Sequence, residues 1–145
     1  MGNLSKDINS TFPSQGVKAL INIKYTASWI ENRSNTILKP FQISVQQYNI
    51  LRILRGAKEQ VTVQTVKDRM IEKSPNATRL MDKLCAKNLI ERIRCENDRR
   101  VVYIKIADQG LKLLNEIKMD DTVELMNKLS EEELVLLNSL LDRIR

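Results

Sequence analysis

The side chains with the clearest chemical use stand in two short basic segments, residues 74–83 and 98–100. Guanidinium and ammonium groups bond guanine edges or phosphates, a side-chain amide can pair with adenine, and a threonine methyl can contact thymine. The residues expected to face a duplex, or to begin the element that faces it, are Ser74, Pro75, Asn76, Thr78, Arg79, Lys83, Arg99 and Arg100. These residue types favour binding to nucleic acid over bond-breaking chemistry.

The first basic segment is predicted to lie on a helix that spans residues 75–87. At about 100° per residue, its apolar side chains gather on the face opposite the cations. These apolar residues are Ala77, Leu80, Met81 and Leu84. Ser74 is the expected N-cap, and Pro75 suits the first helical position. A short preceding helix, capped by Thr62, would cross this helix steeply after a brief turn, which is the arrangement of a helix-turn-helix.

Asp82 stands among the cations of this helix, and two roles are open to it. It could form a helix-surface ion pair with Arg79, three residues earlier. It could instead accept a hydrogen bond from a cytosine amine in a major groove. Both roles place Asp82 on the surface that would face a duplex.

The second basic segment is predicted to form the tip of a β-hairpin, or wing, that spans residues 89–106. Asn88 can adopt the left-handed conformation that ends the helix, and β-branched, alternating strands follow at 89–94 and 101–106. One tip arginine would pair with Asp98 and stiffen the hairpin, while the other, Arg99 or Arg100, would enter a minor groove. Exposed arginines at a hairpin tip can also be merely hydrated charges. Their position after a basic helix favours the groove.

Basic charge is concentrated in the segment that carries these motifs. Residues 44–106 hold 14 Lys or Arg and 7 Asp or Glu, a net charge of +7, whereas the rest of the chain has a net charge of −1. A merely solvated surface would mix the signs throughout, so this concentration favours a polyanion-binding face. The sequence has no histidine, and its two cysteines are not spaced as zinc ligands, so we expect no enzyme, metal or cofactor.

With this layout the chain resembles the multiple-antibiotic-resistance regulator (MarR) family of bacterial winged-helix transcription factors. The resemblance rests on ATRLMDKL at 77–84, LIER at 89–92, DRR at 98–100 and IADQG at 106–110, and it extends more loosely over 17–144. It implies a mainly α-helical fold with a small β-hairpin wing. It also implies a homodimer that reads a near-palindromic operator, with Arg99 in the minor groove and Asp98 and Arg100 as the supporting pair. The two arginines can exchange roles in this assignment.

The chain is predicted to form a single domain with two regions. Residues 17–38 and 108–145 would form a helical dimerisation region, and residues 44–106 a winged helix-turn-helix. The first helix carries two apolar stripes, more than one contact requires. Ser44 and Gln47 form a capping-box pattern at the start of the next helix, and Asp108 can cap a helix that continues toward Leu129. The last helix begins with a capping box at Ser130 and Glu133. The apolar residues that follow at Leu134, Leu137, Leu141 and Ile144 are spaced 3, 4 and 3 residues apart, as in a helix-packing seam. That seam would receive a helix of a second copy or the first helix of the same chain.

Two further groups of residues are candidates for regulation. A ligand cleft between the dimer helices and the winged region could be lined by aromatic residues that are otherwise ordinary core side chains, namely Tyr25, Trp29, Phe41 and Tyr48. Cys85 and Cys95 are too few for a disulfide framework. Cys95 follows Arg94 at the start of the wing tip, so it is the stronger candidate for a redox switch.

The sequence thus predicts a cytoplasmic regulator that binds specific duplex DNA, as a repressor of nearby genes that a small ligand or an oxidant releases. No apolar run approaches the roughly 20 residues needed to cross a bilayer, so no membrane partner is expected. The alternative is a winged helix that serves protein association without operator specificity. In that case the face that carries Arg79 and Lys83 would meet an acidic protein surface.

Overall fold

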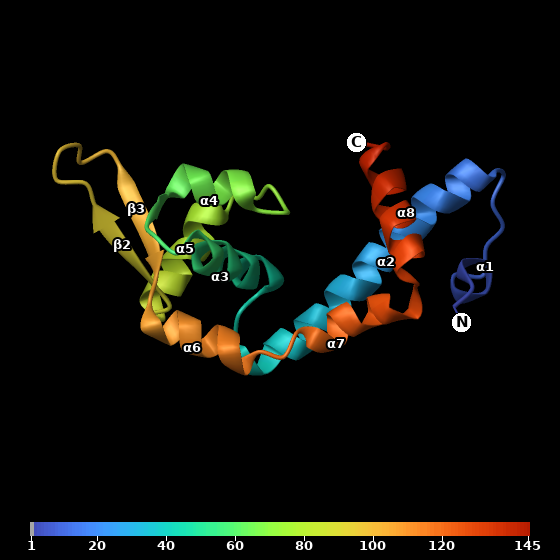
Figure 1. Ribbon diagram of the computed structural model, residues 1–145, viewed down its shortest axis with the longest axis horizontal. Coiled ribbons are helices and arrows are strands. Elements are labelled where there is room, and N and C mark those ends of the chain that lie inside the picture. The colour runs from blue at the N-terminus through green and yellow to red at the C-terminus, as the bar shows by residue number, and fades with distance from the viewer. Residues whose placement is uncertain (1) are drawn as a thin grey trace.

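The computed structural model describes residues 2–145, except for the side chains of Asp120 and Asp121. Its elements form a winged lobe and an extended helical arm (Figure 1). The lobe contains α3 (Val45–Ala57), β1 (Val61–Thr62), α4 (Val63–Arg69), α5 (Ala77–Ala86), β2 (Ile90–Arg94), β3 (Val102–Ile106) and α6 (Asp108–Glu116). The arm contains α1 (Leu4–Asp7), α2 (Gln15–Leu38), η1 (Lys39–Phe41), α7 (Asp120–Val123), η2 (Glu124–Lys128) and α8 (Glu131–Asp142). The mainly helical fold with a small wing is confirmed.

The core of the winged lobe forms where α3, α5 and β3 meet. α3 begins with the capping box expected at Ser44 and Gln47, in which each side chain accepts a hydrogen bond from the other residue's backbone N–H. The fully buried side chains at the junction are Leu51, Leu54, Met81, Leu84 and Ile104. Full burial of one such side chain contributes about 1.5–3 kcal/mol, so this cluster sets the orientation of α5 in the lobe.

The wing belongs to a three-stranded antiparallel sheet in the order β1-β3-β2. The hairpin of β2 and β3 was expected, but β1 was not, because its two residues are too short to show alternation. Thr62, which ends β1, also begins α4: its hydroxyl accepts a hydrogen bond from the Thr65 N–H, as predicted. β1 therefore ties the first helix of the helix-turn-helix to the wing.

The start of α5 differs from the prediction. The helix begins at Ala77 rather than at residue 75, and Asn76 occupies the N-cap position without a side-chain capping bond. The Ser74 hydroxyl accepts a hydrogen bond from the Asn76 N–H, and the Ala77 N–H donates to the Ser74 carbonyl at 3.3 Å. Residues 74–76 thus form a tight turn, because the serine hydroxyl satisfies a nearer backbone donor than the helix would offer.

The end of α5 follows the prediction. Asn88 has a φ of 57°, in the left-handed region. The Asn88 N–H donates to the Cys85 carbonyl at 2.9 Å, and the Leu89 N–H donates to the Leu84 carbonyl at 3.0 Å. These two bonds form a Schellman motif, which satisfies carbonyl groups at the helix end and turns the chain directly into β2.

The helical segment predicted at residues 108–145 is less continuous than expected. α6 ends at Glu116, and Ile117 has an extended backbone, so the helix expected from Asp108 onward is broken before α7. Ala107, not Asp108, occupies the N-cap of α6. α8 begins with the predicted capping box of Ser130 and Glu133. Among the described residues, no helix combines the length and the apolar character needed to cross a membrane.

Gly110 allows α6 to approach the junction between α5 and the wing. A Cβ at this position would lie 2.3 Å from the Leu89 carbonyl oxygen and 2.9 Å from an Ile106 side-chain carbon. The Leu89 carbonyl also accepts a hydrogen bond from the Ala107 N–H at 3.0 Å, so it is held in place. Glycine is therefore required here by close backbone contact rather than by an unusual φ.

The first prediction is that Gly110→Ala destabilises the protein by about 1–3 kcal/mol, the usual cost of overpacking a well-packed site. Urea denaturation followed by circular dichroism measures the change in the free energy of unfolding. Gly56→Ala in α3 is the matched control, because a Cβ added at Gly56 would meet no neighbouring atom within 4 Å. The control should stabilise the helix by about 0.5–1 kcal/mol. Equal effects of the two substitutions would contradict the steric role of Gly110.

Candidate nucleic-acid interface

The outward face of α5 presents the predicted polar residues to solvent. Ala77, Met81 and Leu84 are buried on the opposite face. The residues of the predicted interface that are exposed on α5 or at its start are Pro75, Asn76, Thr78, Arg79 and Lys83. Ser74 is half-buried, because its hydroxyl forms part of the turn before the helix. The structure therefore brings all six of these residues to one end or face of a single element.

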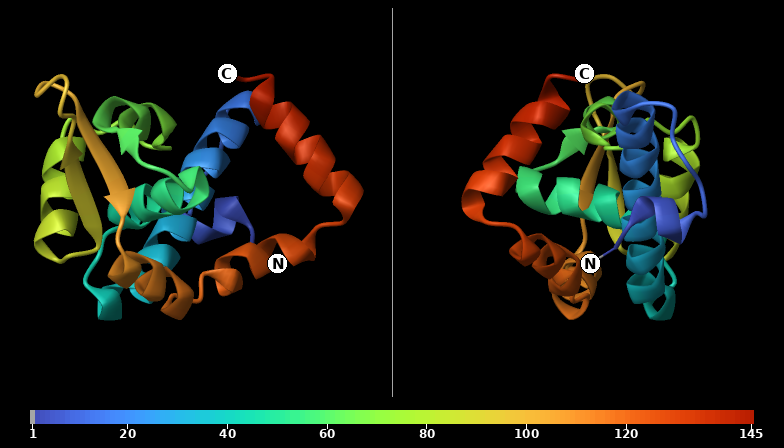
Figure 2. Two further views of the ribbon diagram at one scale, coloured as in Figure 1. Left: turned by 60° about the vertical axis from the view of Figure 1, so that its left-hand side comes forward. Right: turned by 90° about the vertical axis from the view of Figure 1, so that its right-hand side faces the viewer.

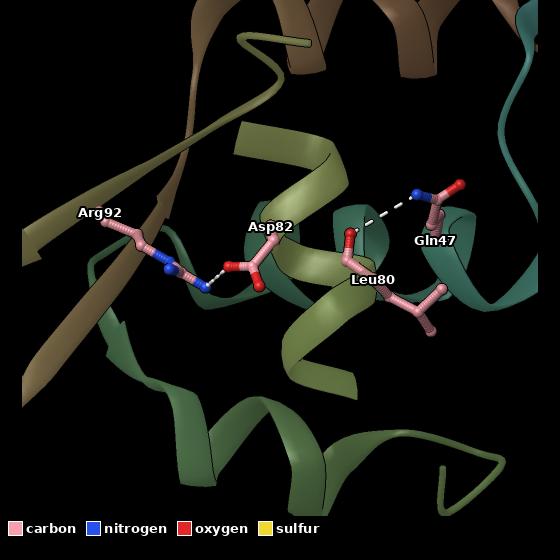
Figure 3. Close-up of polar contacts among 4 residues, drawn as sticks. All are labelled: Gln47, Leu80, Asp82 and Arg92. Atoms are coloured by element: carbon pink, nitrogen blue, oxygen red, sulfur yellow. Dashed lines mark hydrogen bonds and ion pairs between the residues drawn. The ribbon is translucent and has the colours of Figure 1, made fainter. Parts of the chain in front are cut away.

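Asp82 pairs with Arg92 of β2, so the expected ion pair with Arg79 is wrong. Figure 3 shows the carboxylate and the guanidinium pointing toward one another between α5 and the wing. The side chains of Arg92 and Asp82 are 38% and 52% exposed. An ion pair that exposed contributes only about 0.2–1 kcal/mol. Its main effect is to restrain the Arg92 side chain against α5, across a contact that helix periodicity alone does not reveal.

Gln47 provides a second contact that sequence reasoning missed. Its side chain is buried, and its amide nitrogen donates to the Leu80 carbonyl at 3.5 Å (Figure 3). Its amide oxygen accepts the Ser44 N–H, so one side chain caps α3 and contacts the middle of α5. The capping-box pattern revealed only the first of these contacts. Gln47 thus joins the start of α3 to the helix that carries the exposed cations.

The wing tip is closed by backbone hydrogen bonds around Asp98. The Asp98 carboxylate accepts a hydrogen bond from the Arg100 N–H at 2.9 Å, and its carbonyl accepts one from the Val101 N–H at 3.0 Å. The expectation that Asp98 pairs with an arginine side chain is therefore wrong, although Asp98 does stiffen the tip. The side chains of Arg99 and Arg100 are both exposed. The carboxylate satisfies the backbone and leaves the two cations directed to solvent.

A hollow of about 320 Å³ separates the start of α5 from the wing sheet. Its lining residues are Val63, Thr78, Arg92, Arg94 and Val102. Thr78 was expected at the interface, whereas Arg92 and Arg94 were not, because they precede the wing tip in a strand. Alternation along β2 places both arginines on the same face of the sheet, and this is the signal that could have identified them.

The four aromatic residues proposed for a ligand cleft do not line one cavity. Tyr25 and Trp29 line a hollow of about 400 Å³ beside α1 and Lys128. Tyr48 lines a different hollow, of about 450 Å³, where the Arg52 guanidinium lies 6.0 Å from the centre of its ring. Phe41 is half-buried and packs against the core of the lobe. Within the described part of one chain, the aromatic residues thus lie in separate environments.

The two cysteines lie in different parts of the winged lobe, and both are half-buried and free. Cys85 is on α5 and Cys95 follows β2. Burial raises the pKa of the Cys85 thiol; the Arg92 guanidinium opposes this shift, and the Asp82 carboxylate adds to it. A raised pKa lowers the thiolate fraction, which disfavours oxidation of Cys85. No three His, Cys, Asp or Glu side chains gather as a metal site in the residues for which side chains are described.

Comparison with known proteins gives a consistent result. Residues 33–117 match the family model for the transcriptional regulator SarA/Rot. The HTH-type transcriptional regulator MhqR of Bacillus subtilis is 27% identical over 133 residues, which cover 90% of this chain and 91% of that protein. A MarR transcription factor from Planctomyces limnophilus is 32% identical, with coverage of 91% of this chain and 98% of its own and a TM-score of 0.70.

A further solved structure shares the fold. It is a MarR mutant from E. coli complexed with operator DNA, which is 24% identical over 99% of both chains and has a TM-score of 0.75. The order of elements in the lobe, the exposed cations of α5 and the wing agree with these matches. The chain therefore belongs to the SarA/Rot family of transcriptional regulators and has the MarR winged-helix fold.

Proposed function

We propose that this regulator binds a specific duplex DNA operator, with α5 in a major groove and the wing tip in the adjacent minor groove. The observation that carries the proposal is that the exposed cations of α5 and the exposed arginines of the wing belong to one rigidly packed lobe. A recognition helix followed by a wing is a common arrangement for reading neighbouring grooves. The E. coli MarR structure of the same fold is bound to operator DNA, which supports this proposal.

The residues of the interface have different roles in this proposal. Arg79 and Lys83 lie along the exposed face of α5, where they would contact guanine edges or phosphates. Asn76 would reach adenine from the start of the helix, and Thr78 would contact a thymine methyl or a phosphate. At the wing tip, Arg99 would enter the minor groove with Arg100 beside it. Asp98 supports both arginines through the backbone bonds that close the tip.

We also propose that the protein acts as a homodimer assembled through the helical arm. α8 has no buried residue within the chain, and it stands apart from the winged lobe (Figure 2). Its large exposed apolar side chains are Val135, Leu136, Leu137 and Leu140, and Ile144 follows just beyond its end. Those of α2 are Val17, Leu20, Ile23, Tyr25 and Trp29. An apolar surface is expected to mark a protein interface when exposed residues of this kind gather on it. A two-fold dimer would present two winged lobes to a near-palindromic site.

For regulation, we propose that the protein is a cytoplasmic repressor of nearby genes without a catalytic role. A small ligand or an oxidant would release it from DNA. The hollow lined by Tyr25 and Trp29 lies on the arm, because Leu4 of α1 and Lys128 of η2 also line it. The hollow at Tyr48 lies on α3, and Met119, in the segment that joins α6 to α7, also lines it. A ligand bound in the hollow at Tyr48 would change the angle between the arm and the winged lobe. Of the two cysteines, Cys95 remains the candidate for oxidation, because burial disfavours the Cys85 thiolate.

The second prediction concerns DNA binding. Arg99→Ala should weaken binding to a duplex from the gene's own upstream region and should lower the slope of log affinity against log salt by about one unit per subunit. Arg79→Ala should also relax sequence preference, because a lost base contact costs about 1–3 kcal/mol of discrimination. Fluorescence anisotropy across a salt series, with a scrambled duplex of equal length, measures both effects.

The control for these variants is Lys112→Ala, which removes a cation from an exposed position on α6, at the base of the wing. This control should retain the operator preference and the salt slope. If the unmodified protein bound both duplexes equally and weakly, operator recognition would be refuted and the protein-association role would take its place.

The third prediction concerns the dimer. Leu136→Glu combined with Leu140→Glu should dissociate the protein to monomers, because two charges would enter an apolar contact. Leu136 and Leu140 are 58% and 43% exposed within one chain, so the substitutions disturb little of the intrachain core. Sedimentation velocity measures the mass. Asn138→Glu, on the opposite side of α8, should remain dimeric, and a dimeric double variant would place the interface elsewhere.

A further inference from the structure

We propose that the hollow between α5 and the wing sheet holds a phosphate of the DNA strand that separates the two grooves. Arg94 supplies the free positive charge of this site, and Arg92 forms one wall, where Asp82 holds it. The inference rests on the proposed function and adds residues to it, since neither Arg92 nor Arg94 belongs to the recognition face of α5 or to the wing tip.

The geometry comes from the pairing of the wing strands. Arg92 lies opposite Ile104, and Arg94 lies opposite Val102. Residues opposite one another share a face of the sheet, and alternate residues of a strand do so too. Ile104 is fully buried in the core, so this face turns toward the helices. The two arginines therefore extend along the face of the wing that looks toward α5, and both line the hollow with Thr78.

The charge of the hollow is positive because only one of its two guanidinium groups is neutralised. Arg92 is paired with the Asp82 carboxylate (Figure 3). Arg94 is exposed and has no ion-pair partner among the residues whose side chains are described. The lining contains no carboxylate. The walls of the hollow are mainly apolar, with Val63 and Val102 among them, and Arg94 and Thr78 are its lining residues that could bind an anion.

The position of the hollow identifies the anion. A duplex that receives α5 in its major groove and the wing tip in the next minor groove must pass one sugar-phosphate strand between these two elements. The hollow lies between the start of α5 and the same wing. Guanidinium and hydroxyl groups are common phosphate contacts, and such contacts fix the register of a protein on DNA without reading sequence. A phosphate of that strand is therefore the occupant that this location and charge select.

Asp82 acts in this site as a positioning residue. Its ion pair keeps the Arg92 guanidinium against α5, where it shapes the hollow. Without the carboxylate, Arg92 would be a second free cation near the same phosphate strand. The pair thus limits sequence-independent attraction at this point to one guanidinium per subunit. Sequence discrimination is then left to α5.

The fourth prediction tests Arg94. Arg94→Gln should weaken binding to the upstream duplex and to the scrambled duplex by the same factor, and should reduce the salt slope by about 0.9 per subunit. Lys112→Gln is the matched control, because it removes the same charge from α6 at the base of the wing. Anisotropy titrations in a salt series give both quantities, and thermal melting verifies that each variant is folded.

Two results would overturn the role of Arg94. If the salt slope of Arg94→Gln equalled that of Lys112→Gln, Arg94 would not contact a phosphate. A loss confined to the upstream duplex would show that it reads bases instead. The proposed function is tested separately by the unmodified protein. If that protein failed to distinguish the duplexes while Arg94→Gln still lowered the slope, the phosphate site would stand and operator specificity would fail.

A double-mutant cycle tests the role of Asp82. Asp82→Asn should free Arg92, so affinity for both duplexes should rise and the salt slope should steepen by about 0.9 per subunit. In an Arg92→Gln background, Asp82→Asn should leave the slope unchanged. A structural role alone would not change a salt slope in this background-dependent way. Equal slope changes in the two backgrounds would mean that Asp82 acts only as a nearby negative charge, which would overturn its positioning role.

Discussion

The packing of α5 against α3 and β3 is the constraint on which the interface depends. Met81 and Leu84 are completely buried at this contact, together with Ile104 of β3. A helix with 3.6 residues per turn that buries these positions must turn Thr78 and Arg79 outward. The direction of the exposed cations is thus a consequence of the core. Substitutions on the polar face of α5 can therefore occur without altering the buried residues that orient this helix.

The junction between α5 and β2 extends this constraint to the wing. The Schellman motif at Asn88 satisfies the last carbonyls of α5, and the Leu89 carbonyl then accepts the Ala107 N–H. Gly110 lets α6 lie against the same carbonyl. Nearer the exposed face, the ion pair of Asp82 with Arg92 spans the gap between helix and sheet. The backbone bonds at Asn88, Leu89 and Ala107, together with this side-chain ion pair, set the position of the wing relative to α5.

The sequence predicted most of the features that arise from local spacing, although the N-caps expected at Ser74 and Asp108 lie at Asn76 and Ala107 instead. The capping boxes at Ser44 and Ser130, the Thr62 cap and the left-handed Asn88 all depend on residues within a few positions of one another, and each is present. Contacts between distant residues were missed or misassigned. Asp82 was matched with Arg79, a neighbour on its own helix, whereas its partner is on another element. Local periodicity carries no information about which strand faces a helix.

The mainly helical fold and the basic character of the winged segment followed from the sequence by itself, because they depend on composition, periodicity and the order of elements. The family followed from the resemblance of short motifs in the sequence. The tertiary structure decided where the charges meet. It placed Arg92 and Arg94 beside Thr78, turned the Asp98 carboxylate to the backbone of the wing tip, and separated Tyr25 and Trp29 from Tyr48. The physical reason is that a hollow or an ion pair between two elements depends on their crossing and register, which are set by side-chain packing between residues far apart in the chain.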